Sequence, residues 1–252
     1  MLTSRVIPCL DVRDNRVVKG VKFSGLRDVG TPALLAAKYE RQGADELVVL
    51  DVSATNANRS MRLETVQQVR EALSIPLTVG GGVRTIEDVQ RLTDAGTDKV
   101  SMNSAAVQSP ELIGSVANLF GSQCTVVAVD VRWASGHWEV LTHAGTKATG
   151  QNVIEWVREV ESRGAGEVLL TSFDRDGTRS GYDCDLLRSV SDAVSIPVIA
   201  SGGASNALHM REAFDAGASA VLIASILHDG VTTVARLKKE LETMGVCVRG
   251  VC

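Results

Sequence analysis

The sequence lacks the features of a secreted, membrane-bound or nucleic-acid-binding protein. Aromatic residues make up only 4% of the 252 residues, the formal net charge is −4, and the Lys and Arg residues are scattered rather than clustered. No apolar run reaches the ~18 residues typical of a membrane-spanning helix, and the first residues lack a secretory apolar segment of usual length. We therefore expect a cytoplasmic globular protein that binds neither membrane nor nucleic acid.

Metal-binding and disulfide-forming patterns are also missing. The five cysteines include no CxxC pair, and the four histidines show no HExxH or similar spacing. Cys9 and Cys124 lie inside apolar runs, where a small buried hydrophobe is expected, and no role follows for Cys247 or Cys252. We therefore expect neither a bound metal nor a cofactor.

The sequence does contain a repeat of about half its length. Ile75–Ala105 reads IPLTVGGGVRTIEDVQRLTDAGTDKVSMNSA, and Ile196–Ile226 reads IPVIASGGASNALHMREAFDAGASAVLIASI, an offset of 121 residues with nine identities. Each copy reads as a strand, a glycine turn, a helix and a second strand. The same offset relates Gly43–Glu46 to Gly164–Glu167, so the repeated unit is half the chain.

Alternating strands and helices run along the whole chain. Apolar runs typical of strands buried on both faces occur near residues 5–11, 47–51, 77–79, 99–103, 125–130, 168–172, 198–201 and 220–224. Helical patterns occur at 32–43, 61–73, 86–96, 153–164, 183–194, 207–217 and 232–245. This alternation, and a length near the ~250 residues typical of such barrels, predict one (β/α)8 TIM barrel over residues 1–252. We expect two homologous half-barrels, about 1–120 and 121–252.

Two insertions interrupt the alternation at equivalent places. Residues 13–30 follow Asp11 at the end of the first strand, and residues 132–150 follow Asp130 at the end of the fifth. The alternation in HWEVLTH predicts an extra hairpin in the second insertion. Both insertions are expected over the C-terminal ends of the barrel strands, where barrels of this class carry their active sites.

Two aspartates are the first candidates for catalysis. A single Asp at a strand end often only caps the next loop, but Asp11 and Asp130 occupy equivalent half-barrel positions and each precedes an insertion. Barrel geometry is expected to place them across the mouth from each other, where a carboxylate pair suits general acid–base chemistry. Asp51 also ends a strand, but no unusual loop follows it, so we rank it lower.

Glycine turns and small residues at strand ends predict two phosphate sites. Such residues allow backbone N–H groups to approach an anion, although tight turn geometry alone would also require some glycine. The first site would combine Gly81 and Gly82 with Asn103 and Ser104, and the second Gly202 and Gly203 with Ala224 and Ser225. The loop at 174–181, with Asp176 and Gly177, ends at the same mouth and is a further candidate for substrate contact.

Charged residues stand at the starts of four strands, at the opposite end of the predicted barrel. They are Arg5, Glu46, Lys99 and Glu167. Charges at strand starts are usually a solvated rim. Two cations and two anions could instead close a ring across the barrel floor, as a structural plug or a gate.

The chain resembles a known family along its entire length. The motifs are IPCLDV, RVVKGV, GADELVVLDV, VGGGVRTIED, DKVSMNSAAV, FGSQCTVVAVD, GAGEVLLTSFDRDGTRSGYD and IASGGA. They are similar to the cyclase subunit of imidazole glycerol phosphate synthase, a lyase of histidine biosynthesis. The resemblance implies a barrel that adds ammonia to a phosphoribulosyl-formimino-aminoimidazole carboxamide ribonucleotide, which carries a phosphate at each end. The expected products are imidazole glycerol phosphate and aminoimidazole carboxamide ribotide.

The resemblance also implies roles for individual residues. The catalytic aspartates fall on Asp11 and Asp130, and the interface aspartate on Asp98. The flexible-loop lysine falls on Lys19, and the phosphate-binding positions fall on Gly82, Asn103, Ser104, Gly203, Ala224 and Ser225. Beside these family positions, we also expect substrate or phosphate contacts at Gly81, Thr171, Asp176, Gly177 and Gly202. The four charges of the floor match an ammonia gate. A glutaminase partner would dock on that N-terminal face, forming a heterodimer, and send ammonia through the barrel.

The sequence departs from the usual family pattern at several positions. They are Lys22, Ala144, Ser205, Leu227 and Asp229, the last three beside the predicted second phosphate site. Two other interpretations remain open from the residues alone. A sister isomerase with the same half-barrel repeat would also use paired aspartates and two phosphate sites, and a barrel retained only as a docking subunit would need neither. The floor charges and the VVKGV segment argue against the isomerase, and the intact aspartates and glycine turns against the docking subunit.

Overall fold

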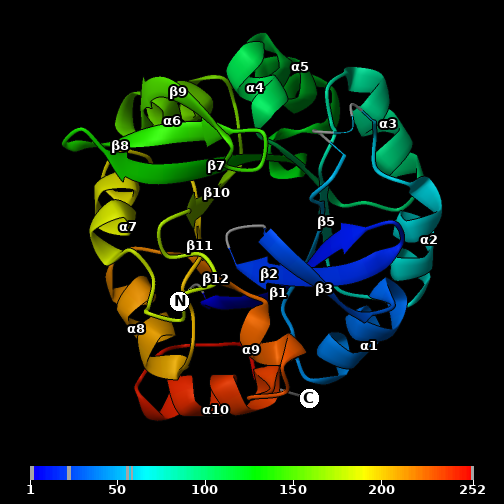
Figure 1. Cartoon of the computed structure of the whole chain (residues 1–252), viewed down its shortest axis with the longest axis vertical. Helices are drawn as coiled ribbons and strands as arrows, with labels where there is room; N and C mark the ends of the chain where they lie inside the picture. The colour runs from blue at the N-terminus through cyan, green and yellow to red at the C-terminus, as the bar shows by residue number, and fades with distance from the viewer. Residues whose placement is uncertain (1–2, 22–23, 55–56, 58, 251–252) are drawn as a thin grey trace.

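The computed structural model describes residues 3–21, 24–54, 57 and 59–250. Lys22 and Cys252 therefore lie outside the described residues. Within those residues, eight parallel strands close into a barrel surrounded by helices (Figure 1). The barrel strands are β1 (Arg5–Arg13), β4 (Leu47–Asp51), β5 (Leu77–Gly80), β6 (Lys99–Met102), β7 (Thr125–Ala134), β10 (Glu167–Ser172), β11 (Val198–Ser201) and β12 (Ala220–Ile223). Each pairs with the next in parallel, and β12 pairs with β1, so the predicted (β/α)8 barrel is confirmed.

The helices form an outer ring whose apolar side packs on the strands. They are α1 (Pro32–Arg41), α2 (Leu63–Glu71), α3 (Ile86–Asp94), α4 (Ser104–Gln108), α5 (Glu111–Phe120), α6 (Val153–Ser162), α7 (Cys184–Ser191), α8 (Ala207–Asp215), α9 (Ser225–His228) and α10 (Val234–Thr243). Helix α3 is an example of how the sequence forms these helices. Thr85 and Asp88 form a reciprocal cap at its N-terminus, and Val89 and Leu92 then face the core. The sequence patterns did not predict α4, α5 and α9.

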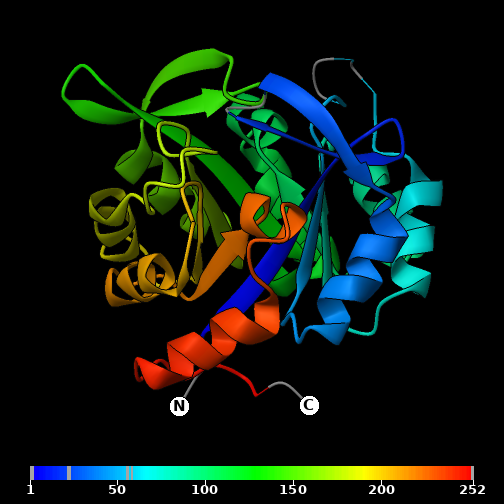
Figure 2. The same cartoon turned by 60° about the horizontal axis from the view of Figure 1, so that its bottom comes forward.

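Each predicted insertion forms antiparallel strands over the mouth of the barrel. In the first, β2 (Arg16–Val21) pairs with the end of β1 and with β3 (Ser24–Gly30), which makes a flap, the β2–β3 flap. In the second, β8 (His137–Thr142) pairs with β7 and with β9 (Lys147–Asn152), which confirms the predicted hairpin. Figure 2 shows both insertions at one end of the barrel and α10 at the other. No helix in the described ranges is both long and apolar enough to span a membrane.

The barrel interior contains an apolar layer between two polar ones. Its buried members are Ile7, Cys9, Val48, Val126, Leu169, Ile199, Ala220 and Leu222. Because side chains alternate along each strand, residues two positions away point inward at the two ends. On β1 this order is Arg5 at the floor, Ile7 and Cys9 in the middle, and Asp11 at the mouth. The strands thus place one set of charges at each end.

Candidate active site

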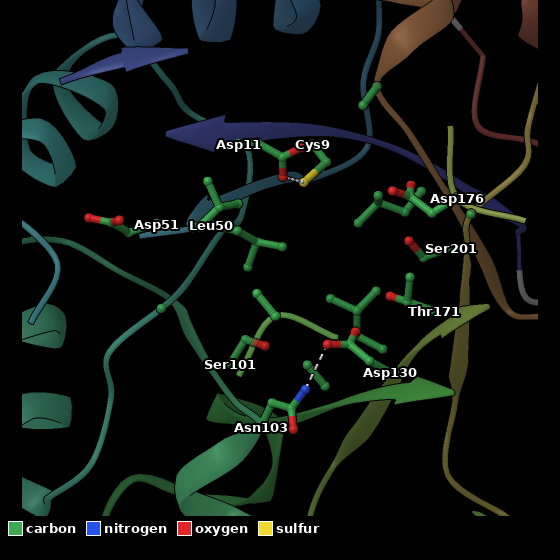
Figure 3. Close-up of a pocket in the computed structure, with 18 of the residues that line it drawn as sticks. Cys9, Asp11, Leu50, Asp51, Ser101, Asn103, Asp130, Thr171, Asp176 and Ser201 are labelled. Atoms are coloured by element: carbon green, nitrogen blue, oxygen red, sulfur yellow. Dashed lines mark hydrogen bonds between the residues drawn. The ribbon is translucent and has the colours of Figure 1, made fainter. Parts of the chain in front are cut away.

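A cavity of about 280 Å³ opens at the C-terminal ends of the barrel strands. Its lining includes every mouth residue that the sequence singled out for catalysis or for substrate binding. These are Asp11, Lys19, Gly81, Gly82, Asn103, Ser104, Asp130, Thr171, Asp176, Gly177, Gly202, Gly203, Ala224 and Ser225. Asp11 and Asp130 lie on opposite sides of this cavity, as Figure 3 shows. The closed barrel therefore brings together residues from both ends of the chain.

Asp130, on β7, is buried and has a strongly altered acidity. Its Oδ2 accepts a hydrogen bond of 2.9 Å from the amide Nδ2 of Asn103, which follows β6. Burial raises the pKa of the Asp130 carboxyl to about 7, and the negative charge of Asp176 adds to the rise, while hydrogen bonds from Thr171 and Asn103 oppose it. Near neutral pH this group is present in both protonation states, so it can accept or donate a proton.

Asp11, on β1, has the opposite environment. The Nζ of Lys19 lies 2.9 Å from its Oδ2, and both side chains are about nine-tenths buried. Burial alone would lower the pKa of Lys19, but the charges of Asp11 and Asp176 outweigh burial and raise it, so Lys19 stays cationic. The Sγ of Cys9 is 3.7 Å from Asp11 Oδ1, and burial raises the pKa of that thiol well above its ordinary value. One mouth carboxylate therefore has a cationic partner and the other a neutral one.

Packing alone requires glycine in the turns after β5 and β11, whether or not a ligand binds there. Gly82 and Gly203 have φ values of 72° and 98°. A Cβ at Gly82 would lie 2.2 Å from the carbonyl oxygen of Arg59, and one at Gly203 would lie 2.1 Å from that of Gly181. Side chains at these positions would force backbone apart, which is why glycine is needed. The turns thereby bring bare backbone to the cavity wall beside Ser104 and Ser225.

Asp51 lies at the same mouth but is already engaged in a local network. Its Oδ1 accepts from Ser53 N and Oγ and from Ala54 N, and Arg59 contacts both carboxylate oxygens, the nearer at 2.6 Å. Because these local hydrogen bonds already engage both carboxylate oxygens of Asp51, they support a structural role. This agrees with its lower rank as a catalytic candidate in the sequence analysis.

The four charges at the opposite end form a closed ring (the floor ring: Arg5, Glu46, Lys99 and Glu167). Arg5 contacts Glu46 at 2.7 Å and Glu167 at 2.5 Å. Lys99 contacts the same two carboxylates at 2.9 and 3.1 Å. Burial opposes ionisation of Glu46, but hydrogen bonds from Lys99 and Arg5 outweigh it and lower the pKa of that carboxyl. The ring closes the barrel below the apolar layer.

Asp98 lies just before β6 on the rim of the floor and is about half exposed. Its Oδ2 accepts from Arg70 at 2.9 Å and from the backbone N–H of Leu77 at 2.8 Å. These bonds leave much of the carboxylate open to solvent. The geometry thus presents Asp98 at the surface, outside the floor ring.

Comparison with known proteins decides between the families that share this architecture. The family model described as "Histidine biosynthesis protein" matches residues 5–233. The chain is 55% identical over 250 residues to the imidazole glycerol phosphate synthase subunit HisF of Myxococcus xanthus, with 99% of each chain covered. It is 51% identical over 249 residues to the HisF subunit of Exiguobacterium sibiricum, covering 99% of this chain and all of the relative. The chain belongs to the HisF family. The resemblance inferred from the motifs is thereby confirmed.

Of the positions at which the sequence departs from the usual family pattern, Ser205 lies in the turn after β11, Leu227 lies in α9, and Asp229 directly follows α9. Leu227 is buried, and the Oγ of Ser205 lies 3.0 Å from the Nδ1 of His209. Asp229, directly after α9, receives hydrogen bonds from Arg27 of the β2–β3 flap and from Arg179 of the loop before α7. Ala144 lines the cavity with a φ of 53°.

Sequence reasoning missed several residues of the cavity wall. They are Ser101, His143, Arg179 and Ser201. Arg179 lay in the loop at 174–181 that was singled out, but its φ of 60° and its orientation depend on packing. His143 donates its backbone N–H to Ser104 Oγ at 2.9 Å and so connects the second insertion to the first glycine-turn site. The described residues contain no cluster of three or more His, Cys, Asp or Glu arranged to hold a metal ion.

Proposed function

We propose that the mouth cavity carries out the cyclase reaction of this HisF-family subunit in histidine biosynthesis, with Asp130 and Asp11 as its acid–base pair. The observation that carries the proposal is the contrast between the two carboxyl groups in one cavity. Asp130 has a pKa of about 7, whereas Asp11 is ion-paired with Lys19. Two carboxyl groups held in different environments can divide the proton transfers of a multistep reaction between them.

In this proposal Asp130 acts first. Ammonia attacks the formimino carbon of the ribulosyl substrate, and the bond from that carbon to the nitrogen of aminoimidazole carboxamide ribotide then breaks. Asp130 takes a proton from the attacking nitrogen and returns it to the leaving nitrogen, which a group with a pKa of about 7 can do in both directions. Its hydrogen bond from Asn103 keeps the carboxyl oriented into the cavity.

Asp11 then assists ring closure. The new nitrogen attacks the ribulosyl ketone, and loss of water gives the imidazole ring. Asp11 transfers protons in this step, while Lys19 balances its charge and belongs to the β2–β3 flap above the cavity. A flap at this position supports exclusion of bulk water during the reaction.

The other residues of the cavity wall would bind the substrate along its length. One phosphate would lie beside Gly82 and Ser104, and the other beside Gly203 and Ser225, where bare backbone and a hydroxyl are available. Thr171, Asp176 and Gly177 line the cavity between them and would contact the central part of the substrate. The two-fold correspondence of these turns supports a long ligand with an anion at each end.

The floor is proposed as the entry side for ammonia. A glutaminase subunit docked on the N-terminal face, with Asp98 in the contact, would deliver ammonia to the floor ring. Opening one ion pair of the ring would admit it to the barrel interior. The closed ring of four contacts supports a gate that is shut in the isolated subunit.

The test is turnover of the ribulosyl substrate with ammonium salt at high pH, without any partner. Asp11→Asn and Asp130→Asn should each reduce kcat by a factor of about 100 to 10,000 or more, the range for loss of an acid–base group. Binding of inorganic phosphate should remain within about twofold of wild type, because both anion sites stay intact. Asp51→Asn is the matched control and should keep most of its activity. Near-wild-type rates in both catalytic variants would overturn the assignment.

A further inference from the structure

Asp229 connects two elements of the mouth through a single carboxylate. Its two oxygens separately accept from Arg27 on β3 and from Arg179 in the loop between β10 and α7. Figure 1 shows α9, which Asp229 follows, between the β2–β3 flap and that loop. Arg27 and Arg179 are about half exposed, and Asp229 is about one-quarter exposed.

Arg179 stands at the edge of the cavity, beside the turn assigned to the second phosphate. It lines the cavity together with Gly203, Ala224 and Ser225. The backbone N–H of Gly181, two residues after Arg179, donates to the carbonyl of Gly203 at 2.8 Å, which fixes the loop against the glycine turn. A guanidinium here can reach an anion bound at that turn, and phosphate is a stronger partner for it than a carboxylate because of its higher charge.

We propose that Arg179 is a ligand of the substrate's second phosphate and that Asp229 is the ion-pair partner of Arg179 until the substrate arrives. The inference rests on the proposed function, since it needs a phosphate at the Gly203 turn. In the subunit without substrate, Asp229 neutralises the charge of Arg179. The incoming phosphate then displaces the Asp229 carboxylate from Arg179. Asp229 keeps its contact with Arg27, which is the register partner of Lys19 across the flap. Phosphate binding at Arg179 therefore acts, through Asp229 and Arg27, on the β2–β3 flap that carries Lys19.

The experiment is calorimetric titration of the whole subunit with inorganic phosphate, fitted to two sites. Asp229→Asn should tighten one of the two affinities by about threefold, the size expected when an exposed competing ion pair is removed, and should leave the other unchanged. Asp229→Glu should restore the wild-type value. Arg179→Gln should weaken the same affinity, and in that background Asp229→Asn should have no effect.

The matched control is Asp215→Asn on α8, which removes the same charge from another exposed pair, with Arg211 at 3.1 Å. It should leave both phosphate affinities unchanged. An unchanged affinity in Asp229→Asn, or an equal gain when Arg179 is absent, would refute the displacement and point instead to long-range charge. If the wild-type subunit turns over substrate and binds phosphate, but Asp229→Asn leaves both phosphate affinities unchanged, only this inference is refuted. A wild-type subunit that neither binds phosphate nor turns over refutes the proposed site itself.

Discussion

The two ends of the barrel use the same kinds of charged group in opposite ways. At the floor, each of the two cations contacts both carboxylates, so the four charges are balanced within one ring. At the mouth, Asp11 has the cation Lys19, but the hydrogen bonds to Asp130 come from neutral side chains, and Asp176 adds a like charge. Burial disfavours the ionised form of both carboxyl groups. At Glu46 the two cations outweigh burial and lower the pKa, whereas at Asp130 burial and the charge of Asp176 together raise the pKa.

This difference shows what each end is arranged to do. A carboxylate surrounded by cations stays ionised and holds structure together, because its proton affinity is too low for proton transfer near neutral pH. A buried carboxyl without a cation can exchange protons, but folding must then place it in an unfavourable environment. Neutralising Asp130 should therefore reduce catalysis and increase stability. Neutralising a carboxylate of the floor ring should instead reduce stability and have little effect on turnover.

The largest effect on stability is expected for Asp130→Asn. A carboxyl whose pKa rises from 3.8 to about 7 on folding makes the wild-type chain less stable as the pH rises through that window, and the loss is constant above it. Removing the carboxyl should therefore raise the free energy of unfolding at pH 8 by up to about 4 kcal/mol, and by almost nothing at pH 4. Urea unfolding at both pH values measures this difference.

Asp11→Asn is the control for that experiment, because it changes the same atoms in the same cavity. It removes the carboxylate that contacts the buried Lys19, so it should lower stability at pH 8 rather than raise it. Equal gains in the two variants would mean that any mouth carboxylate is strained, and the contrast between the two aspartates would be lost.

Much of the fold was predictable from the sequence, because burial on both faces leaves continuous apolar runs. The eight barrel strands begin and end within about two residues of the predicted ranges except where β1 and β7 continue into the insertions. Helix α5 was missed because Gly114, a poor helix former, stands inside its short sequence and weakens the helical pattern. The β2–β3 flap was missed because glycines break its alternation. The division into half-barrels near residue 120 stays a prediction.

The site was predictable where strand ends determine position, and not where side chains meet across the fold. Asp11 and Asp130 could be placed at one mouth because a closed parallel barrel puts all strand ends there. The contact between Arg179 and Asp229 joins residues 50 positions apart, and that between Arg27 and Asp229 joins residues 202 apart. No local pattern encodes such contacts, because they depend on how two loops and a short helix pack.

An intermediate effect is expected at the floor. Glu167→Gln weakens the contacts to both Arg5 and Lys99 and leaves each cation with Glu46 alone as its carboxylate in the ring. We expect a loss of about 1–3 kcal/mol in the free energy of unfolding, below the value for a fully buried pair because the cations are partly exposed. Turnover with external ammonium salt should remain within a few-fold of wild type.

The control for the floor ring is Glu159→Gln on α6, which breaks an exposed pair with Arg163. Its cost should be below about 0.5 kcal/mol. A loss of turnover in Glu167→Gln that matches the loss in Asp130→Asn would show that the two ends are not separable.

The smallest effect on the isolated subunit is expected for Asp98→Asn, and it separates the rim of the floor from the floor ring. The amide oxygen can still accept the Leu77 N–H, and the contact with Arg70 is exposed, so the stability loss should be about 0.5–1 kcal/mol. Turnover with ammonium salt should not change. If Asp98 belongs to the contact with a glutaminase, glutamine-dependent turnover should need a higher concentration of that partner, whereas kcat at saturation should recover. An unchanged partner requirement would place the docking contact elsewhere on the N-terminal face.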